Sequence, residues 1–203
     1  MATGITDKEG ETSGGQALTF EHWDEALNKE TRRLMKHFLG ESMGLLKCSS
    51  EESEPLSTMK RTVCRVLKKY RTAYDGFFEE LPVDDKGDKV MSLSVLAHSI
   101  FADGAINWGR IVSLVAFGVV VCQNSNKEEE EERLALVESV GEKISTYLLT
   151  DQRDWLLKNN SWVGFVEFYA EPVPEPESEH VLVDKLLCIA GFAVIGALIY
   201  LCK

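Results

Sequence analysis

Apolar side chains recur every three or four residues along most of the chain. This spacing predicts amphipathic helices over residues 19–38, 57–81, 90–101 and about 130–150, with two shorter helices after Asp151 and Ser161, which we expect to act as caps. No segment alternates with a period of two for long enough to predict a strand. The pattern therefore predicts an all-α fold, a bundle of about eight helices.

One further segment, Ile111 to Cys122, is apolar on every face except at Ser113, which predicts a buried central helix. Asn107 is a suitable N-cap for it. Arg110 then lies in the first turn, where the helix dipole disfavours a cation, and Gly109 lowers the helix propensity there. Two unfavourable choices at one helix end suggest a functional site. The alternative is that Arg110 faces water or pairs with an internal carboxylate such as Asp103.

The two ends of the chain differ from its middle. Residues 1–17 are small and polar, which predicts disorder, and residues 18–170 form the expected helical domain. An acidic, proline-rich linker over 171–184 leads to residues 185–203, which contain the uncharged stretch Leu186–Cys202 between two lysines. A helix of that length is close to what a bilayer requires, so we expect a C-terminal transmembrane anchor. A buried core helix is the alternative.

Composition narrows the functional classes. The net charge of −11 with no visible basic face argues against nucleic-acid binding. The five cysteines are scattered, without metal-ligand spacing, and are expected to be reduced thiols of a cytosol-facing protein. The four histidines are far apart, and no phosphate-binding loop occurs. We therefore expect neither an enzyme nor a metal or cofactor site.

Two motifs carry a resemblance to a known family. "NWGRIVSLVAFG" resembles the first homology region of the Bcl (B-cell lymphoma) family of apoptosis regulators, and "WLLKNNSWVGFVEFY" resembles the second, with Trp162, Gly164 and Phe165 at its core. The order of helices and anchor also fits, so the resemblance covers Thr19 to Lys203. The segments "RTAYDGFFEEL", "FADGAINWGRIVSLVAFG" and "QRDWLLKNNSWVGFVEFY" are most similar to the myeloid cell leukaemia branch, whose members are survival factors.

The chain departs from that family in two places. The branch usually has a long N-terminal region, whereas only about 17 residues precede the expected first helix. The third homology region normally reads Leu-x-x-x-Gly-Asp, and the matching positions here are Met59, Val63 and Cys64. The stretch Ser49–Glu54 could be a phosphorylated turnover signal or a solvated loop.

The resemblance implies a groove that receives an amphipathic helix with four apolar anchors and one Asp. Arg110 matches the arginine that pairs with that Asp, Asn107 matches a neighbouring hydrogen-bond donor, and Gly109 belongs to the same motif. Asp103 could pair with a partner Arg or serve the turn with Gly104. By the same correspondence the apolar pockets would be lined by Tyr74, Phe77, Leu93, Leu96, Ile100, Leu114 and Phe117. Each of these is also a candidate for ordinary core, Phe117 above all.

The implied function is that of an anti-apoptotic regulator. It would sequester pro-death helices, of the Bak, Bax, Bim, Puma or Noxa kind, and so block permeabilisation of the mitochondrial outer membrane. The alternative is a Bak- or Bax-like executioner, and a tail-anchored adaptor is a third candidate. An executioner inserts the helix of its own third homology region into the groove of another molecule. Val63 and Cys64 stand where that helix normally has Gly and Asp, so this chain is poorly suited to such insertion. We expect the protein to lie in the mitochondrial outer membrane, facing the cytosol, with the endoplasmic reticulum and the cytosol as further locations.

Overall fold

The structure, a computed structural model, describes residues 13–47, 52–81, 83 and 89–170. Within these residues it contains seven α-helices and no strand, so the predicted all-α class is confirmed. In chain order they are α1 (Ser13–Ser42), α2 (Glu54–Glu80), α3 (Ser92–Ile100), α4 (Trp108–Asn124), α5 (Glu130–Thr150), α6 (Arg153–Lys158) and α7 (Ser161–Ala170).

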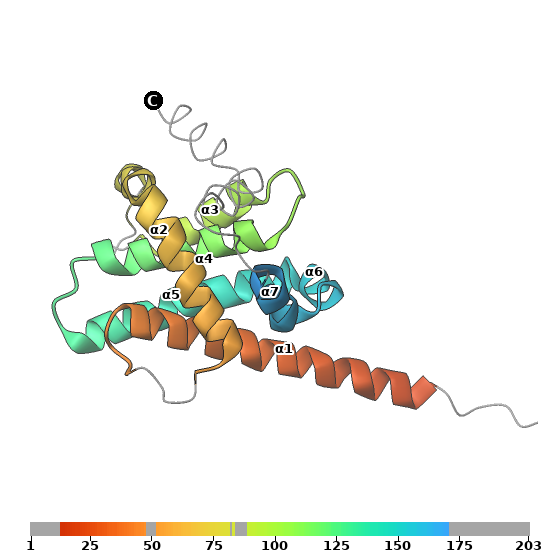
Figure 1. The fold of residues 1–203 in the computed structure, drawn as a ribbon. Coiled ribbons are helices and arrows are strands. Elements are labelled where there is room, and N and C mark those ends of the chain that lie inside the picture. Colours follow the sequence, from red (N-terminus) through yellow and green to blue (C-terminus); the bar gives the residue numbers. More distant parts are fainter. Residues whose placement is uncertain (1–12, 48–51, 82, 84–88, 171–203) are drawn as a thin grey trace, which may run out of the picture.

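Helix α4 lies at the centre of the bundle. Helix α2 crosses it, α3 and α5 pack along it, and α1 runs beside α5 (Figure 1). Every residue of α4 from Trp108 to Cys122 is buried, which confirms the predicted central helix. Burying one Val, Ile or Leu side chain contributes about 1.5–3 kcal/mol, so this helix organises the core.

Two helices begin earlier than the sequence pattern predicted. Helix α1 begins at Ser13 rather than Thr19, so part of the segment expected to be disordered is helical. Gln16, Ala17 and Leu18 are good helix formers and extend the helix upstream. Helix α2 begins at Glu54 because Pro55 occupies its first turn, where the missing N–H of proline removes no helical hydrogen bond.

The predicted caps at Asp151 and Ser161 are both wrong. Asp151 ends α5, and Gln152 precedes α6 without a side-chain cap. Ser161 has φ 50° and Asn160 has φ 61°, both left-handed, whereas a side-chain N-cap adopts extended backbone. These two residues reverse the chain between α6 and α7 and bring α7 back against α2. Glu130, Glu131 and Glu132 lie in the first turn of α5, where the helix dipole favours acidic side chains.

The predicted linker and membrane anchor, residues 171–203, lie outside the described residues. Among the described residues, no helix is both long enough and apolar enough to cross a bilayer.

Candidate helix-binding groove

The first turn of α4 is fixed by Asn107. Its backbone is extended (φ −162°, ψ 167°), and its side-chain oxygen accepts a hydrogen bond from the backbone N–H of Arg110 at 2.9 Å. The predicted N-cap is therefore confirmed. The cap sets where α4 begins and thereby holds Arg110 in the first turn, close to the loop that joins α3 to α4.

The guanidinium of Arg110 is buried and ion-paired with Asp103. Nη2 donates to Oδ2 of Asp103 at 2.7 Å, and Nη1 donates to Oδ1 of the same carboxylate. Nη1 also donates to the backbone carbonyl of Ala105 at 2.6 Å. Arg110 is only 8% exposed, whereas the Asp103 side chain is 58% exposed. The internal-carboxylate alternative is thus what the structure contains, and binding of a partner by Arg110 stays a prediction.

Asp103 also serves the turn. Its Oδ1 accepts a hydrogen bond from the backbone N–H of Ala105 at 3.0 Å, and Gly104 between them has φ 74°. The hydrogen bond from Arg110 and that from Ala105 hold the pKa of the Asp103 carboxyl well below its usual range. The same pair raises the pKa of Arg110. Both side chains are therefore charged at neutral pH, and the ion pair at the N-terminus of α4 has no net charge.

The predicted groove side chains from α2 and α4 meet in the core. The ring of Phe117 lies 5.4 Å from that of Phe77, edge to face, and 6.4 Å from that of Tyr74. The Tyr74 hydroxyl donates to the backbone carbonyl of Ser113 at 3.4 Å, and burial raises its pKa. Leu114 is fully buried.

Helix α3 supplies the other predicted groove residues. Leu93, Leu96 and Ile100 are buried against the bundle, whereas Met91 and Val95 are 56% and 53% exposed. The predicted apolar positions all belong to one continuous cluster of buried side chains. They therefore form one apolar layer, in which α3 packs on α4 and α5.

A cluster of aromatic rings supports the start of α4, and the sequence did not indicate it. Trp108, next to the cap, has its ring 4.8 Å from that of Trp155, 5.9 Å from that of Trp162 and 5.4 Å from that of Phe165. Trp162 is anchored in turn by donating to the hydroxyl of Thr31 at 2.9 Å. The second motif thus packs against Trp108, the first residue of α4. The tryptophans that occur in both motifs could have indicated this contact between the two motifs.

Gly164 has a steric role in the second motif. A Cβ atom at this position would lie 1.9 Å from the backbone oxygen of Asn159, a distance that no side chain tolerates. The absent Cβ lets α7 fold closely against the preceding turn and bring Trp162 and Phe165 to Trp108.

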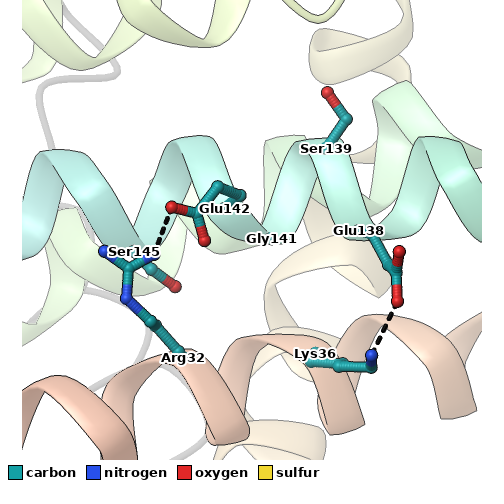
Figure 2. Close-up of a pocket in the computed structure, with 7 residues that line it drawn as sticks. All are labelled: Arg32, Lys36, Glu138, Ser139, Gly141, Glu142 and Ser145. Atoms are coloured by element: carbon teal, nitrogen blue, oxygen red, sulfur yellow. Dashed lines mark hydrogen bonds and ion pairs between the residues drawn. The ribbon is translucent and has the colours of Figure 1, made fainter.

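A separate hollow of about 430 Å³ lies between α1 and α5. Figure 2 shows the two ion pairs that span it, Arg32 with Glu142 and Lys36 with Glu138, the latter at 2.6 Å. Both pairs join α1 to α5, and none of the predicted groove residues lines this hollow. We interpret it as a polar seam between two packed helices.

Comparison with known proteins decides the family. Residues 59–162 match the profile described as "Apoptosis regulator proteins, Bcl-2 family". The chain belongs to the Bcl-2 family. It is 29% identical to apoptosis regulator R1 of Xenopus laevis over 70% of its length, and 30% identical to the anti-apoptotic protein NR13 of Gallus gallus over 51%. It is 32% identical to human Bcl-2-like protein 1 over 50% of its length.

The chain spans only part of these relatives, since the matches cover 61% of R1, 58% of NR13 and 41% of Bcl-2-like protein 1. Solved structures of the zebrafish pro-survival protein NRZ share the fold. The complex with Bad BH3 has a TM-score of 0.57 at 24% identity, covering 72% of this chain and 96% of NRZ. The form without peptide has a TM-score of 0.59, also at 24% identity, covering 73% and 97%. The myeloid cell leukaemia branch stays a prediction.

Proposed function

We propose that this protein is an anti-apoptotic regulator that sequesters pro-death helices in a groove between α2, α3, α4 and α5. The observation that carries the proposal is a buried arginine at the mouth of an apolar helix, fixed by an N-cap and flanked by an apolar layer. The names of its relatives, among them the anti-apoptotic NR13, support the same function. So does NRZ, a pro-survival protein of the same fold that was solved with Bad BH3.

We expect α3 to shift when a helix binds. Leu93, Leu96 and Ile100 are buried in the apolar layer, so the anchors of an incoming helix would have to pack between them. Helix α3 has only nine residues, and its N-cap residue Met91 makes no side-chain capping bond. A short helix without a side-chain cap has little stability of its own, which makes α3 the most easily displaced of the four groove helices. The expected partners are helices of Bak, Bax or the Bim, Puma and Noxa kind.

The chain is better suited to receive a helix than to donate one. Met59 and Val63 on α2 are buried, so the region that an executioner must expose is part of the core. Cys64 is exposed on the same helix, but its thiol cannot replace the carboxylate that pairs with a groove arginine. A peptide of residues 56–78 should therefore bind groove proteins poorly, and Val63→Gly with Cys64→Asp should improve its binding.

We further propose that residues 186–202 anchor the protein in the mitochondrial outer membrane, with the helical domain facing the cytosol. The support is the uncharged apolar stretch between Lys185 and Lys203. Its length is close to that of the hydrocarbon core, and lysine side chains at both ends can reach the headgroups.

The deciding experiment titrates the full chain with labelled Bim-, Puma-, Noxa- and Bad-type peptides, and then adds it to liposomes permeabilised by activated Bax. A survival factor should bind at least one peptide and reduce release of the liposome contents. Release caused by this chain alone, together with tight binding of the unmodified 56–78 peptide to a groove protein, would support the executioner instead. Binding to no peptide would contradict the groove function.

A further inference from the structure

Helix α2 carries a row of basic side chains on its outer face. The members of this basic row are exposed and spaced so that they share one side of the helix: Arg61, Arg65, Lys68 and Lys69. Met59, Val63 and Tyr74, on the opposite side of α2, are buried in the core. No acidic residue occurs between Arg61 and Lys69. The basic row is thus a strip of one charge sign on a chain whose net charge is −11.

The basic row has no ionic partner within the part of the chain that the structure describes. Lys69 lies over the ring of Tyr70, with its nitrogen 5.4 Å from the ring centroid, and Arg61 donates to a backbone carbonyl. None of the four side chains forms an ion pair with a described carboxylate. Like charges three or four residues apart on a helix repel each other, so an acidic occupant would relieve a repulsion that the described residues leave in place.

The end of α7 lies at one end of the basic row. Nη2 of Arg61 donates to the backbone carbonyl of Tyr169 at 3.4 Å, and α7 packs on α2 (Figure 1). The chain continues after Ala170 with "EPVPEPESE", residues 171–179, which lie outside the described residues and which we call the acidic segment. It contains four glutamates and no basic residue: Glu171, Glu175, Glu177 and Glu179. The acidic segment therefore begins beside the basic row.

The lengths of the basic row and the acidic segment match. Arg61 and Lys69 are eight positions apart on α2, which corresponds to about 12 Å along the helix axis. An extended, proline-rich chain advances about 3.1 Å per residue, so Glu171 and Glu175 would also be about 12 Å apart. The acidic segment contains three prolines, at positions 172, 174 and 176. Because proline already restricts the backbone to extended conformations, docking of this segment would lose little further entropy.

We propose that the acidic segment docks along the basic row on the outer face of α2, where its glutamates pair with the arginines and lysines. The occupant belongs to the same chain, so its effective concentration at the basic row is of millimolar order, which compensates for the weakness of each exposed ion pair. An anionic membrane surface is the main competing occupant. It is disfavoured because it repels a chain with a net charge of −11.

Docking would shorten the reach between the helical domain and residues 185–203, since the segment that leads to them would be held against α2. The predicted groove residues of α2, Tyr74 and Phe77, lie on its buried side. The inference therefore does not depend on the proposed groove function.

The test couples carboxylates to neighbouring amines with a carbodiimide, in the full chain held in neutral phosphatidylcholine liposomes. Mass spectrometry measures the yield of amide bonds between Lys68 or Lys69 and the glutamates of the acidic segment. Isotope-labelled and unlabelled chains are mixed, so that bonds within one molecule are distinguished from bonds between two. The unmodified chain should form bonds within one molecule. The yield should fall in about 1 M NaCl, where the screening length is about 3 Å.

Variants of Arg65 test the basic row and leave both lysine reporters in place. Arg65→Glu should lower the coupling yield about three- to tenfold, the size expected when one or two exposed ion pairs are lost, whereas Arg65→Lys should retain the yield. Arg33→Glu is the matched control, because Arg33 is an exposed arginine of α1 without an ion pair to a described residue. It changes the net charge equally and should leave the yield unchanged.

Variants of the acidic segment test the same contact from outside the helical domain. Glu175→Gln together with Glu177→Gln should raise the rate at which acetic anhydride modifies Lys68 about two- to fivefold, because the amine loses its carboxylate partners. Glu128→Gln together with Glu129→Gln removes the same charge at two exposed positions just before α5 and should leave that rate unchanged.

Absence of these amide bonds from the unmodified chain, or an equal yield in Arg65→Glu, would overturn the inference. Bonds found only between labelled and unlabelled chains would assign the basic row to a second copy instead. Protection of Lys68 from acetylation only after anionic lipid is added would assign it to a membrane surface. If Arg65→Glu fails to fold in a thermal melt, the acetylation rates of the acidic-segment variants decide, and an unchanged rate there rejects docking.

Discussion

Replacing Arg110 with Ala is the most direct test of the groove. A partner aspartate loses water on entering the groove, and removing one member of such a pair typically costs about 2–5 kcal/mol of binding free energy. Asp103 already satisfies the guanidinium, so the partner gains only the difference between two carboxylates. We therefore expect the lower end of the range, about 2 kcal/mol, which corresponds to about 30-fold weaker peptide binding.

The same substitution should change stability only slightly. The unfavourable position of a cation in the first turn of α4 would by itself predict a variant that melts a little higher. The structure reverses that sign, because the Arg110 guanidinium donates to the carbonyl of Ala105 and pairs with Asp103. Loss of the bond to Ala105 costs about 1 kcal/mol, which lowers the melting temperature by about 2–4 °C for a chain of this size.

The assay is a double-mutant cycle, with titrations of protein and peptide variants and thermal melts by circular dichroism. A peptide whose aspartate is replaced by Ala should lose little more affinity when Arg110 is also replaced, since both changes remove one interaction. Arg32→Ala is the control, because Arg32 pairs with Glu142 between α1 and α5, and α1 carries no predicted groove residue. Additive losses in the cycle, or a variant that is unfolded without peptide, would show that Arg110 is a structural residue and refute the reasoning.

Two further predictions concern the second motif and the C-terminus. Gly164→Ala should destabilise the fold by about 1–3 kcal/mol in urea unfolding, because its Cβ would overlap the carbonyl oxygen of Asn159. Its matched control, Gly76→Ala, has no atom within 4 Å of the new Cβ and should be neutral or raise stability by up to about 1 kcal/mol; equal losses in both variants would contradict the steric argument. The full chain should resist carbonate extraction from membranes while a chain ending at Val173 is soluble and still binds peptide, and release of the full chain by carbonate would contradict the anchor.

The central helix could be predicted because its signal lies within its own sequence. A run of apolar residues from Ile111 to Cys122 can be satisfied only by burial on every side, whatever packs against it. The cap at Asn107 is likewise local, since it depends on a side chain and an N–H three residues apart. Prediction from the sequence succeeded where the cause lies within a single helix and its cap.

Contacts between distant residues could not be predicted in this way. The bond from Trp162 to Thr31 joins α7 to α1, residues 131 apart in the sequence. The need for glycine at position 164 comes from the left-handed turn at Asn160 and Ser161, which the residue types did not reveal. The caps expected at Asp151 and Ser161 were wrong for the same reason, because the path of the chain between α6 and α7 decides which N–H groups those side chains can reach.

The position of Arg110 depends on two causes, the helix dipole of α4 and the loop that brings the carboxylate of Asp103 to its guanidinium. A cation alone in the first turn of α4 is unfavourable, but the carboxylate of Asp103 in front of it makes the helix mouth neutral as a pair. A partner acid that displaces Asp103 preserves that neutrality, whereas a helix without an acid would have to leave Asp103 in place. The helix dipole and the ion pair therefore favour the same event, the exchange of one carboxylate for another. This is why an arginine that is unfavourable in an isolated helix can be suited to recognising an acidic partner.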